Sequence, residues 1–355
     1  MKRYGSLFSK ITSWENLVLA ARRAARAKPM SLAKMAFEFN MERELVCLRK
    51  ELTKGIYRPG PYRTFIIHDP KERLISAAPY RDRVVHHALC NIIEPLFDRS
   101  FLPQNYANRK GRGLHMAVKA GSRIVNSSVY ILKGDIRKYF PSIDHRILKE
   151  KIRRKIKCRP TLELISLIID NSNEQEDVIF YFPGDNMFTP LERRKGLPIG
   201  NLTSQLFANI YLDGFDHFVV QHLKIKRYAR YVDDCVLGSD SKEHLHVAFE
   251  KITRFMQVIR LKLHERKTVV FPAKRGMTFL GFRLYPGKVL AGKRCGKRFK
   301  ARLKQMQKEY ARGDIDLRGI KQVIASYNGH LAHGATKKLR SGILNGFPFV
   351  KASHG

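Results

Sequence analysis

Residues 227–238 read RYARYVDDCVLG, with two adjacent aspartates between two short apolar runs. The alternation on each side of Asp233 and Asp234 predicts two short antiparallel strands joined by a tight turn. Turns tolerate aspartate well, so an Asp–Asp pair at a hairpin tip is often only a solvated turn. The pair gains a chemical role only if a further acidic group lies near it.

A third carboxylate, Asp135, follows the apolar stretch VYILKG at 129–134. This position is also typical of the N-cap of a helix. If this stretch and the hairpin share one sheet, Asp135 and Asp233 meet at one edge, where carboxylates repel unless a cation lies between them. Mg²⁺ is usually held by one or two carboxylates plus substrate phosphates. The aspartates therefore predict a phosphoryl-transfer centre with two Mg²⁺ ions, for which Mn²⁺ is a substitute.

The overall charge narrows the class of partner. The 355 residues include 68 Lys and Arg against 31 Asp and Glu, a formal net charge of +37. This excess argues against an ordinary enzyme of small neutral substrates and favours a polyanion, whose phosphates release counterions on binding. A basic, ribosome-associated structural protein is the alternative. Hydrophobic residues make up 44% of the chain, which is enough for a sizeable core.

Several other classes of protein are not expected. The five cysteines are scattered and never form C-x-x-C, which argues against disulfides and a Cys-rich zinc site. The N-terminal MKRYGSLFSK lacks the apolar segment of a signal peptide, and no run of about 18 apolar residues suggests a membrane span. The histidines at 86–87, 330 and 333 lack metal-ligand spacing. We therefore expect a cytoplasmic protein with no membrane partner.

Hydrophobic periodicity predicts an α+β chain. Helices are expected within 14–54, 80–97 (ending near Pro95), 145–170, 202–223, 242–262 and 296–312. Strands are expected within 56–79, at 129–134, in hairpins at 178–196 and 227–238, and as one strand at 278–284. Residues 285–355 hold sixteen basic and three acidic side chains, which is typical of a separate basic lobe.

Seven segments follow one another in a fixed order. They are KERLISAAPYRDRVVHHAL (71–89), FLPQNYANRKGRGLHMAV (101–118), LKGDIRKYFPSIDH (132–145), GLPIGNLTSQLFANIYL (196–212), YVDD (231–234), LHERKTVVF (263–271) and FLGF (279–282). In this order they resemble the sequence blocks of reverse transcriptases of the prokaryotic group-II-intron-like branch. The resemblance implies a right-hand polymerase fold, with fingers, a palm with an antiparallel sheet and a helical thumb. The implied parts are a basic helical extension (1–60), fingers (61–128), palm (129–144), a fingers/palm insertion (145–195), palm (196–284) and a basic helical thumb (285–355).

The resemblance also implies roles for single residues. Asp135 and Asp233 would bind both metal ions, with Asp234 as the third carboxylate. Phe140 falls on the steric gate, where a bulky ring excludes a ribose 2′-OH and favours dNTPs. Arg73 matches a fingers arginine whose guanidinium suits the triphosphate. Further nucleotide contacts are implied at Ile199, Gly200, Gln205 and Lys267, and a primer grip at Phe279, Leu280, Gly281 and Phe282.

The fourth segment departs from the usual family form. Most reverse transcriptases have Gln-Gly where this chain has Ile199-Gly200, and Ser-Pro where it has Ser204-Gln205. The form IGNLTSQ is characteristic of diversity-generating retroelements, whose enzymes copy a template-repeat RNA with errors at adenine. The cDNA then replaces a variable region of a target gene. Isoleucine cannot make the hydrogen bond that glutamine offers, a loss of about 0.5–1.5 kcal/mol and up to roughly tenfold in discrimination.

The implied partners are template RNA, primer or cDNA, dNTPs and a basic, homo-oligomeric accessory variability protein, in a bacterium or its phage. The exposed cations expected to contact duplex RNA backbone are Lys293, Arg294, Lys297, Arg298 and Lys300. A retron, abortive-infection or group-II-intron reverse transcriptase is the alternative. Retron enzymes usually keep Ser-Pro, and an intron protein is expected to continue beyond SYNGHLAHGATKKLR (326–340). A non-catalytic RNA-binding relic of the fold is a third hypothesis.

Overall fold

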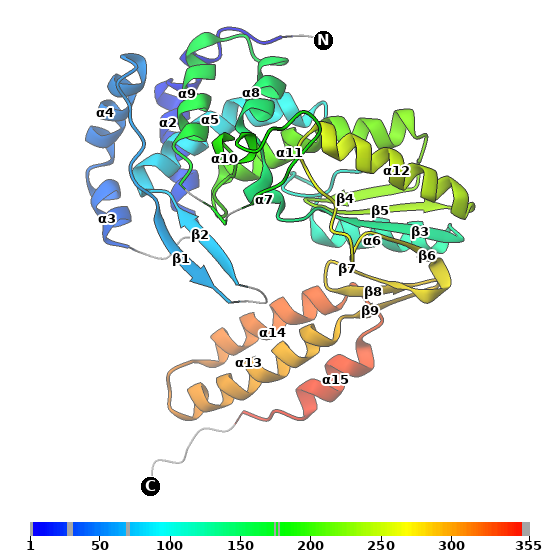
Figure 1. The fold of residues 1–355 in the computed structure, drawn as a ribbon. Helices are drawn as coiled ribbons and strands as arrows, with labels where there is room; N and C mark the ends of the chain where they lie inside the picture. The colour runs from blue at the N-terminus through cyan, green and yellow to red at the C-terminus, as the bar shows by residue number, and fades with distance from the viewer. Residues whose placement is uncertain (1–2, 27–30, 69–71, 174, 177, 350–355) are drawn as a thin grey trace. The chain divides into compact units, whose positions relative to one another are not determined.

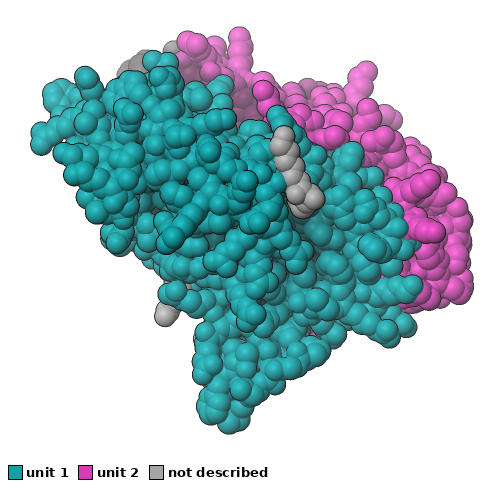
Figure 2. All heavy atoms as spheres, turned by 90° about the horizontal axis from the view of Figure 1, so that it is seen from above, with its two compact units in different colours: residues 1–108, 135–223, 250–264 teal, residues 109–134, 224–249, 265–355 magenta. Residues whose placement is uncertain are grey.

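The computed structural model describes residues 3–26, 31–68, 72–173, 175–176 and 178–349 (Figure 1). The chain forms two compact units, each built from separated segments (Figure 2). Unit 1 comprises residues 1–108, 135–223 and 250–264, and unit 2 comprises 109–134, 224–249 and 265–355. Each unit is therefore assembled from parts of the sequence that lie far apart.

Unit 1 is mainly helical. Its N-terminal helices are α1 (Phe8–Ile11), α2 (Trp14–Ala25), α3 (Leu32–Phe39) and α4 (Met41–Thr53). Ser13 and Ser31 cap α2 and α3 by accepting backbone N–H bonds. The long helix α5 (Tyr80–Asp98) packs against α2, where the buried Asn16 side chain donates to the Ala88 carbonyl at 2.9 Å. This packing gives the unit a rigid helical base.

The rest of unit 1 surrounds a second long helix. This helix, α11 (Leu202–His217), packs against α5 and α8 and ends in a π-helical turn, Phe218–His222. The shorter helices are α7 (Tyr139–Ser142), α8 (His145–Arg153), α9 (Arg159–Asp170) and α10 (Thr189–Glu192). Two antiparallel strands, β1 (Arg63–Ile67) and β2 (Arg73–Ala77), form a separate ribbon.

A four-stranded sheet has the order β4-β5-β3-β6. Its strands are β3 (Tyr130–Asp135), β4 (Tyr228–Tyr231), β5 (Asp234–Ser239) and β6 (Val269–Pro272). In unit 2, helix α6 (Leu114–Asn126) packs against β4, β5 and β8. A smaller sheet follows, with β7 (Met277–Phe279), β8 (Phe282–Tyr285) and β9 (Lys288–Ala291) after the 3-10 turn Ala273–Arg275. Helix α12 spans Lys242–Val258.

Three helices end the described chain: α13 (Lys293–Ala311), α14 (Leu317–Leu331) and α15 (Lys337–Asn345). On α13, apolar side chains at positions 299, 303, 306 and 310 recur at helical spacing and form one buried face. They join Ile320, Leu331 and Ile343 in a core of their own. Most basic side chains of α13 are exposed, including those at positions 293, 294, 297, 298 and 300.

The predicted α+β class, with antiparallel sheets, is confirmed. Several details are wrong. The stretch 145–170 is two helices, broken before Pro160, and α5 continues past Pro95 to Asp98. No strand forms in the described part of 178–196, and 278–284 is a hairpin rather than one strand. The boundaries of fingers, palm and thumb stay a prediction.

His86 on α5 makes stability depend on pH. Its side chain is only 2% exposed, and burial, reinforced by His87 and Arg83, lowers its pKa from 6.5 to about 4. Between pH 6.5 and 4 the unfolded chain therefore binds more protons than the folded chain, so the free energy of unfolding falls as pH falls. We expect His86 to account for about 3 kcal/mol of this loss. Urea denaturation at a series of pH values measures how the free energy of unfolding depends on pH.

A matched pair of variants isolates the contribution of His86. His86→Leu is expected to reduce the dependence between pH 6.5 and 4 by more than His246→Gln does, which replaces an exposed histidine. An unaltered dependence in His86→Leu contradicts the assignment.

Candidate active site

The turn between β4 and β5 lies one residue earlier in the chain than the predicted turn at Asp233 and Asp234. Tyr231 pairs with Asp234, so the two turn residues are Val232 and Asp233, and Asp234 begins β5. Val232 has φ 57°, in the left-handed region that a β-branched residue rarely adopts. Such strain costs on the order of 1–3 kcal/mol and is concentrated at functional sites. The turn is therefore held in shape by its surroundings.

Arg230 supports this turn from inside the protein. Its side chain is only 1% exposed, and its Nη1 donates to the Val232 carbonyl at 2.9 Å. A buried guanidinium is retained only where its donors are bound. Sequence reasoning missed this residue, because an arginine in an alternating strand is usually a solvent-facing one.

The sheet brings the ends of β3 and β5 together. The two strands are hydrogen-bonded neighbours, which is the condition under which the sequence places the aspartates together. A Cβ added at Gly134 would lie 2.6 Å from Cys235 Sγ, so only glycine allows this approach. Asp135 directly follows Gly134, and Asp234 directly precedes Cys235. The two aspartates therefore stand at the ends of neighbouring strands.

The backbone around Asp135 is fixed by a further segment. The Asp135 carbonyl accepts from the His264 N–H at 2.7 Å, and the Arg137 N–H donates to the Lys262 carbonyl at 2.8 Å. Asp135, Asp233 and Asp234 are all half-buried, so each is supported by the protein and still reached by solvent.

The chemistry of the carboxylates suits a hard cation. Mg²⁺ and Mn²⁺ prefer oxygen ligands, and three aspartates supply nothing else. Within the described ranges, no three His, Cys, Asp or Glu side chains are grouped so as to hold a metal ion by themselves. Since Mg²⁺ is usually bound by one or two carboxylates plus substrate phosphates, the strand-end aspartates fit a site that the nucleotide completes.

The segment 197–201 is attached to β2 within unit 1. The Ser76 N–H donates to the Ile199 carbonyl at 3.0 Å, and a Cβ at Gly200, whose φ is 114°, would lie 3.1 Å from Ile75. The buried Asn201 side chain donates to the Ser76 carbonyl at 2.9 Å and accepts from the Ala78 N–H at 3.3 Å. Asn201 thus positions Ile199 and Gly200, a role that no local sequence signal indicates.

Phe140 is tied to the same segment. Its carbonyl accepts from the Leu197 N–H at 3.0 Å, and its half-buried ring packs edge-on against Tyr139. Gln205 is half-buried in the first turn of α11. Arg73 is exposed at the start of β2, opposite Ile67. Backbone hydrogen bonds within unit 1 thus link Phe140 to the segment that holds Ile199 and Gly200, and link that segment to β2 at Ser76. Arg73 lies at the other end of β2.

The family model for reverse transcriptase (RNA-dependent DNA polymerase) matches residues 67–284. The chain belongs to the reverse transcriptase family. It is therefore identified as an RNA-directed DNA polymerase, whose template is RNA and whose substrates are nucleotides. The family is generally dependent on divalent metal ions.

Individual relatives of this reverse transcriptase include intron-encoded proteins. Protein YkfC of Escherichia coli K12 is 26% identical over 281 residues, which cover 68% of this chain and 71% of YkfC. Group II intron-encoded protein LtrA of Lactococcus lactis subsp. cremoris is 24% identical over 322 residues, covering 72% of this chain. The chain spans about half of LtrA, 52%. A putative COX1/OXI3 intron 1 protein of Saccharomyces cerevisiae is 23% identical over 240 residues, 66% of this chain and 26% of that protein.

The predicted primer grip of this reverse transcriptase is a hairpin tip. Phe279 pairs with Phe282, and the turn residues Leu280 and Gly281 both have positive φ, 48° and 85°. Both rings are buried, and a Cβ at Gly121 of α6 would lie 3.0 Å from Phe279. The rings therefore anchor the hairpin, while Gly281 is exposed at its turn.

The remaining predicted residues lie in unit 2. Lys267 is half-buried just before β6. The five predicted RNA-binding cations of α13 are exposed: Lys293, Arg294, Lys297, Arg298 and Lys300. Among the described residues of the reverse transcriptase, no helix is long and apolar enough to cross a bilayer.

Proposed function

We propose that this reverse transcriptase serves a diversity-generating retroelement. It copies a template-repeat RNA into cDNA with errors directed to adenine, and the cDNA enters a variable region of a target gene. The observation that carries the proposal is the pair of departures in the fourth segment, Ile199 and Gln205. The bond from the Ser76 N–H to the Ile199 carbonyl holds the backbone of this segment against β2.

In this proposal the three aspartates hold the metal ions. Two Mg²⁺ ions, or Mn²⁺ in their place, would activate the primer 3′-hydroxyl and stabilise the leaving pyrophosphate. Asp135 and Asp233 hold both ions and Asp234 is the third carboxylate. Phe140 excludes the ribose 2′-OH, Arg73 and Lys267 contact the triphosphate, and the hairpin at 279–282 holds the primer.

The decisive test measures errors base by base. The enzyme extends a DNA primer on an RNA template with dNTPs and Mg²⁺, and the products are sequenced. Wild type is expected to misincorporate most often opposite adenine. Ile199→Gln is expected to lower the error rate by up to roughly tenfold, because it restores one hydrogen bond. Ile199→Val is the control, since it changes size without adding a polar group.

An error rate that is low and equal at all four template bases in wild type contradicts the retroelement assignment. Because such enzymes work with a basic, homo-oligomeric accessory protein, the assay includes that protein where the flanking DNA encodes one. A template repeat and a variable repeat differing at adenines, beside the gene, provide an independent check.

A group-II-intron role is the second candidate, favoured by the similarity to LtrA. Flanking DNA that folds as an intron supports it, while a small structured noncoding RNA supports a retron role. A relic without activity is excluded if the enzyme adds any nucleotide to the primer.

Helix α13 is expected to contact RNA phosphates. Replacing Lys293, Lys297 and Lys300 by glutamine removes three exposed cations. We expect weaker RNA binding and a slope of log affinity against log salt that is smaller by about 2–3, since each lost phosphate contact lowers it by about 0.7–0.9. Fluorescence anisotropy over a salt series measures both.

The matched control removes the exposed cations Lys242, Lys251 and Arg254 of α12. If both triple variants change the slope equally, net charge rather than α13 determines binding, and the assignment is wrong.

A further inference from the structure

A hollow of about 450 Å³ lies in unit 1 beside the N-terminal end of α8, and none of the predicted site residues lines it. Three acidic side chains line it, together with His145 and six cations: Arg146, Lys149, Arg153, Arg193, Arg194 and Arg260. The excess of positive charge suits an anion.

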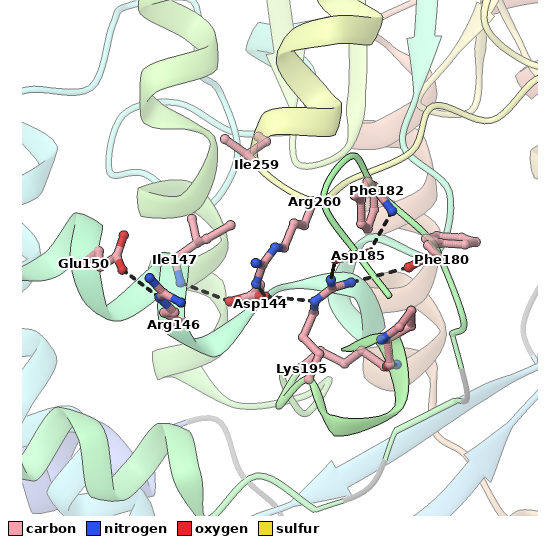
Figure 3. Close-up of polar contacts among 12 residues, drawn as sticks. Asp144, Arg146, Ile147, Glu150, Phe180, Phe182, Asp185, Lys195, Ile259 and Arg260 are labelled. Atoms are coloured by element: carbon pink, nitrogen blue, oxygen red, sulfur yellow. Dashed lines mark hydrogen bonds and ion pairs between the residues drawn. The ribbon is translucent and has the colours of Figure 1, made fainter. Parts of the chain in front are cut away.

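Asp144 and Arg260, which both line the hollow, belong to an ion-pair network (Figure 3). The Asp144 carboxylate is 1% exposed and caps α8 by accepting from the Ile147 N–H at 3.0 Å. Its Oδ2 lies 2.7 Å from Arg260 Nη1 and 3.5 Å from Arg193 Nε. Arg193 also pairs with the buried Asp185. These cations are neutralised and fixed, so they shape the hollow rather than attract the ligand.

The ligand-facing charge comes from other residues. The Arg194 side chain is 70% exposed. Its Nη1 lies 3.5 Å from Asp170 Oδ1, and the Asp170 carboxylate is already bound by Lys149 at 2.6 Å. Arg153 is exposed and forms no ion pair with any residue that the structure describes. Arg153 and Arg194 therefore have binding capacity left for a phosphate.

His145 adds a buried acceptor to the wall of the hollow. Its side chain is 6% exposed and its Nε2 lies 2.7 Å from the Gly196 carbonyl, which places the ring proton on Nε2. Burial lowers the pKa of His145, so the ring is neutral at pH 7. Its buried Nδ1 has no hydrogen-bond partner among the described residues. A buried acceptor of this kind is satisfied by a donor that reaches it, either a water molecule or a hydroxyl group.

The hollow continues along α8 and α9. Arg153 also lines two neighbouring hollows. One is lined by Arg3, Arg154 and Glu150, and the other by Arg159, Glu163 and Asp170. Adjoining hollows that share one arginine suit a polymer better than a single small anion. Only one common polymer places a hydroxyl donor beside each phosphate, and that polymer is RNA.

We propose that this α8–α9 groove (Arg3, His145, Arg153, Arg154, Arg159 and Arg194) binds RNA backbone. A phosphate lies between Arg153 and Arg194, and the adjacent 2′-hydroxyl donates to His145 Nδ1. The proposal rests on the proposed function only in taking RNA as the ligand. It adds a contact surface on unit 1 to the one expected on α13.

The first test uses the double variant Arg153→Gln/Arg194→Gln. Both side chains are exposed, so we expect the variant to keep the fold. The probe is a fluorescein-labelled 40-nucleotide RNA of mixed sequence, over a salt series. The expected result is about tenfold weaker binding and a salt slope smaller by about 1.5–2. Arg49→Gln/Lys50→Gln, at exposed cations of α4, is the matched control and is expected to bind like wild type.

The second test examines the 2′-hydroxyl contact by comparing the RNA probe with DNA of the same sequence. His145→Met is expected to reduce the preference for RNA several-fold. His145→Gln, which keeps a donor for Gly196 and an acceptor for the ligand, is expected to retain more of it. Thermal unfolding of each variant establishes that it is folded.

Unchanged RNA affinity in the double variant overturns the proposal, and so does a loss no larger than in the α4 control. A groove that instead captures a protein gives this same result. Primer extension separates the two proposals. Wild type that extends primers while the groove variant binds RNA normally refutes the groove alone. Groove-dependent RNA binding without any extension refutes the proposed function alone.

Discussion

Asp233→Asn is expected to reduce primer extension on an RNA template by about 10³-fold or more. Asparagine keeps the size of the turn residue but removes the negative charge that would hold a divalent cation in the proposed role of Asp233. Losing several kcal/mol of transition-state charge stabilisation corresponds to a rate loss of this order. Single-turnover extension by one nucleotide measures it, with RNA binding determined in parallel.

Asp240→Asn is the matched control. Asp240 is an exposed carboxylate just beyond β5, where it pairs with Arg227 at 2.7 Å. We expect its extension rate to stay within about twofold of wild type, because exposed ion pairs contribute little. An Asp233→Asn enzyme that retains a tenth of the wild-type rate contradicts the assigned role.

Asp144→Ala is expected to cause the largest loss of stability, about 3–5 kcal/mol in the free energy of unfolding. The substitution leaves the buried Arg193 and the partly buried Arg260 without this carboxylate, and removing one partner of a buried pair costs about this much. It also removes the cap of α8. Urea denaturation measures the change from the midpoint at constant slope.

Glu150→Gln on the same helix provides the comparison. Glu150 pairs with Arg146 at 3.1 Å, but both side chains are exposed, so a loss of no more than about 0.5 kcal/mol is expected. Equal losses in the two variants show that the Asp144 network does not stabilise unit 1.

The β4–β5 hairpin was predictable because alternation and turn residues are local signals, whereas the pairing of β5 with β3 was only a condition that the sequence left open. The stretch VIFYF at 178–182 led to a wrong prediction of a strand. Val178, Phe180 and Phe182 are buried while Ile179 and Tyr181 are about half exposed, yet no strand pairs with them. Instead Lys262 Nζ lies 5.0 Å from the Phe180 ring centre. An alternating pattern indicates that one face of an extended segment is buried, but the segment need not be part of a sheet.

Two other features had no local signal. Leu280 adopts φ 48°, a conformation that leucine rarely takes, so FLGF reads as a continuous strand. Asp144 looks like an ordinary helix cap, and its partner Arg260 lies 116 residues away. Contacts over such distances depend on tertiary packing. The ordered segments were sufficient for the family, whereas the retroelement type depends on a few positions in one segment.

Iron-directed cleavage tests most directly whether the three aspartates share metal ions. Fe²⁺ takes the place of Mg²⁺, and ascorbate with peroxide generates hydroxyl radicals that cut the backbone beside the bound iron. The expected result is cleavage both near 135 and near 233–234, suppressed by excess Mg²⁺ and lost in Asp233→Asn. Cleavage at only one of these segments, or unaffected by Mg²⁺, contradicts a shared metal centre.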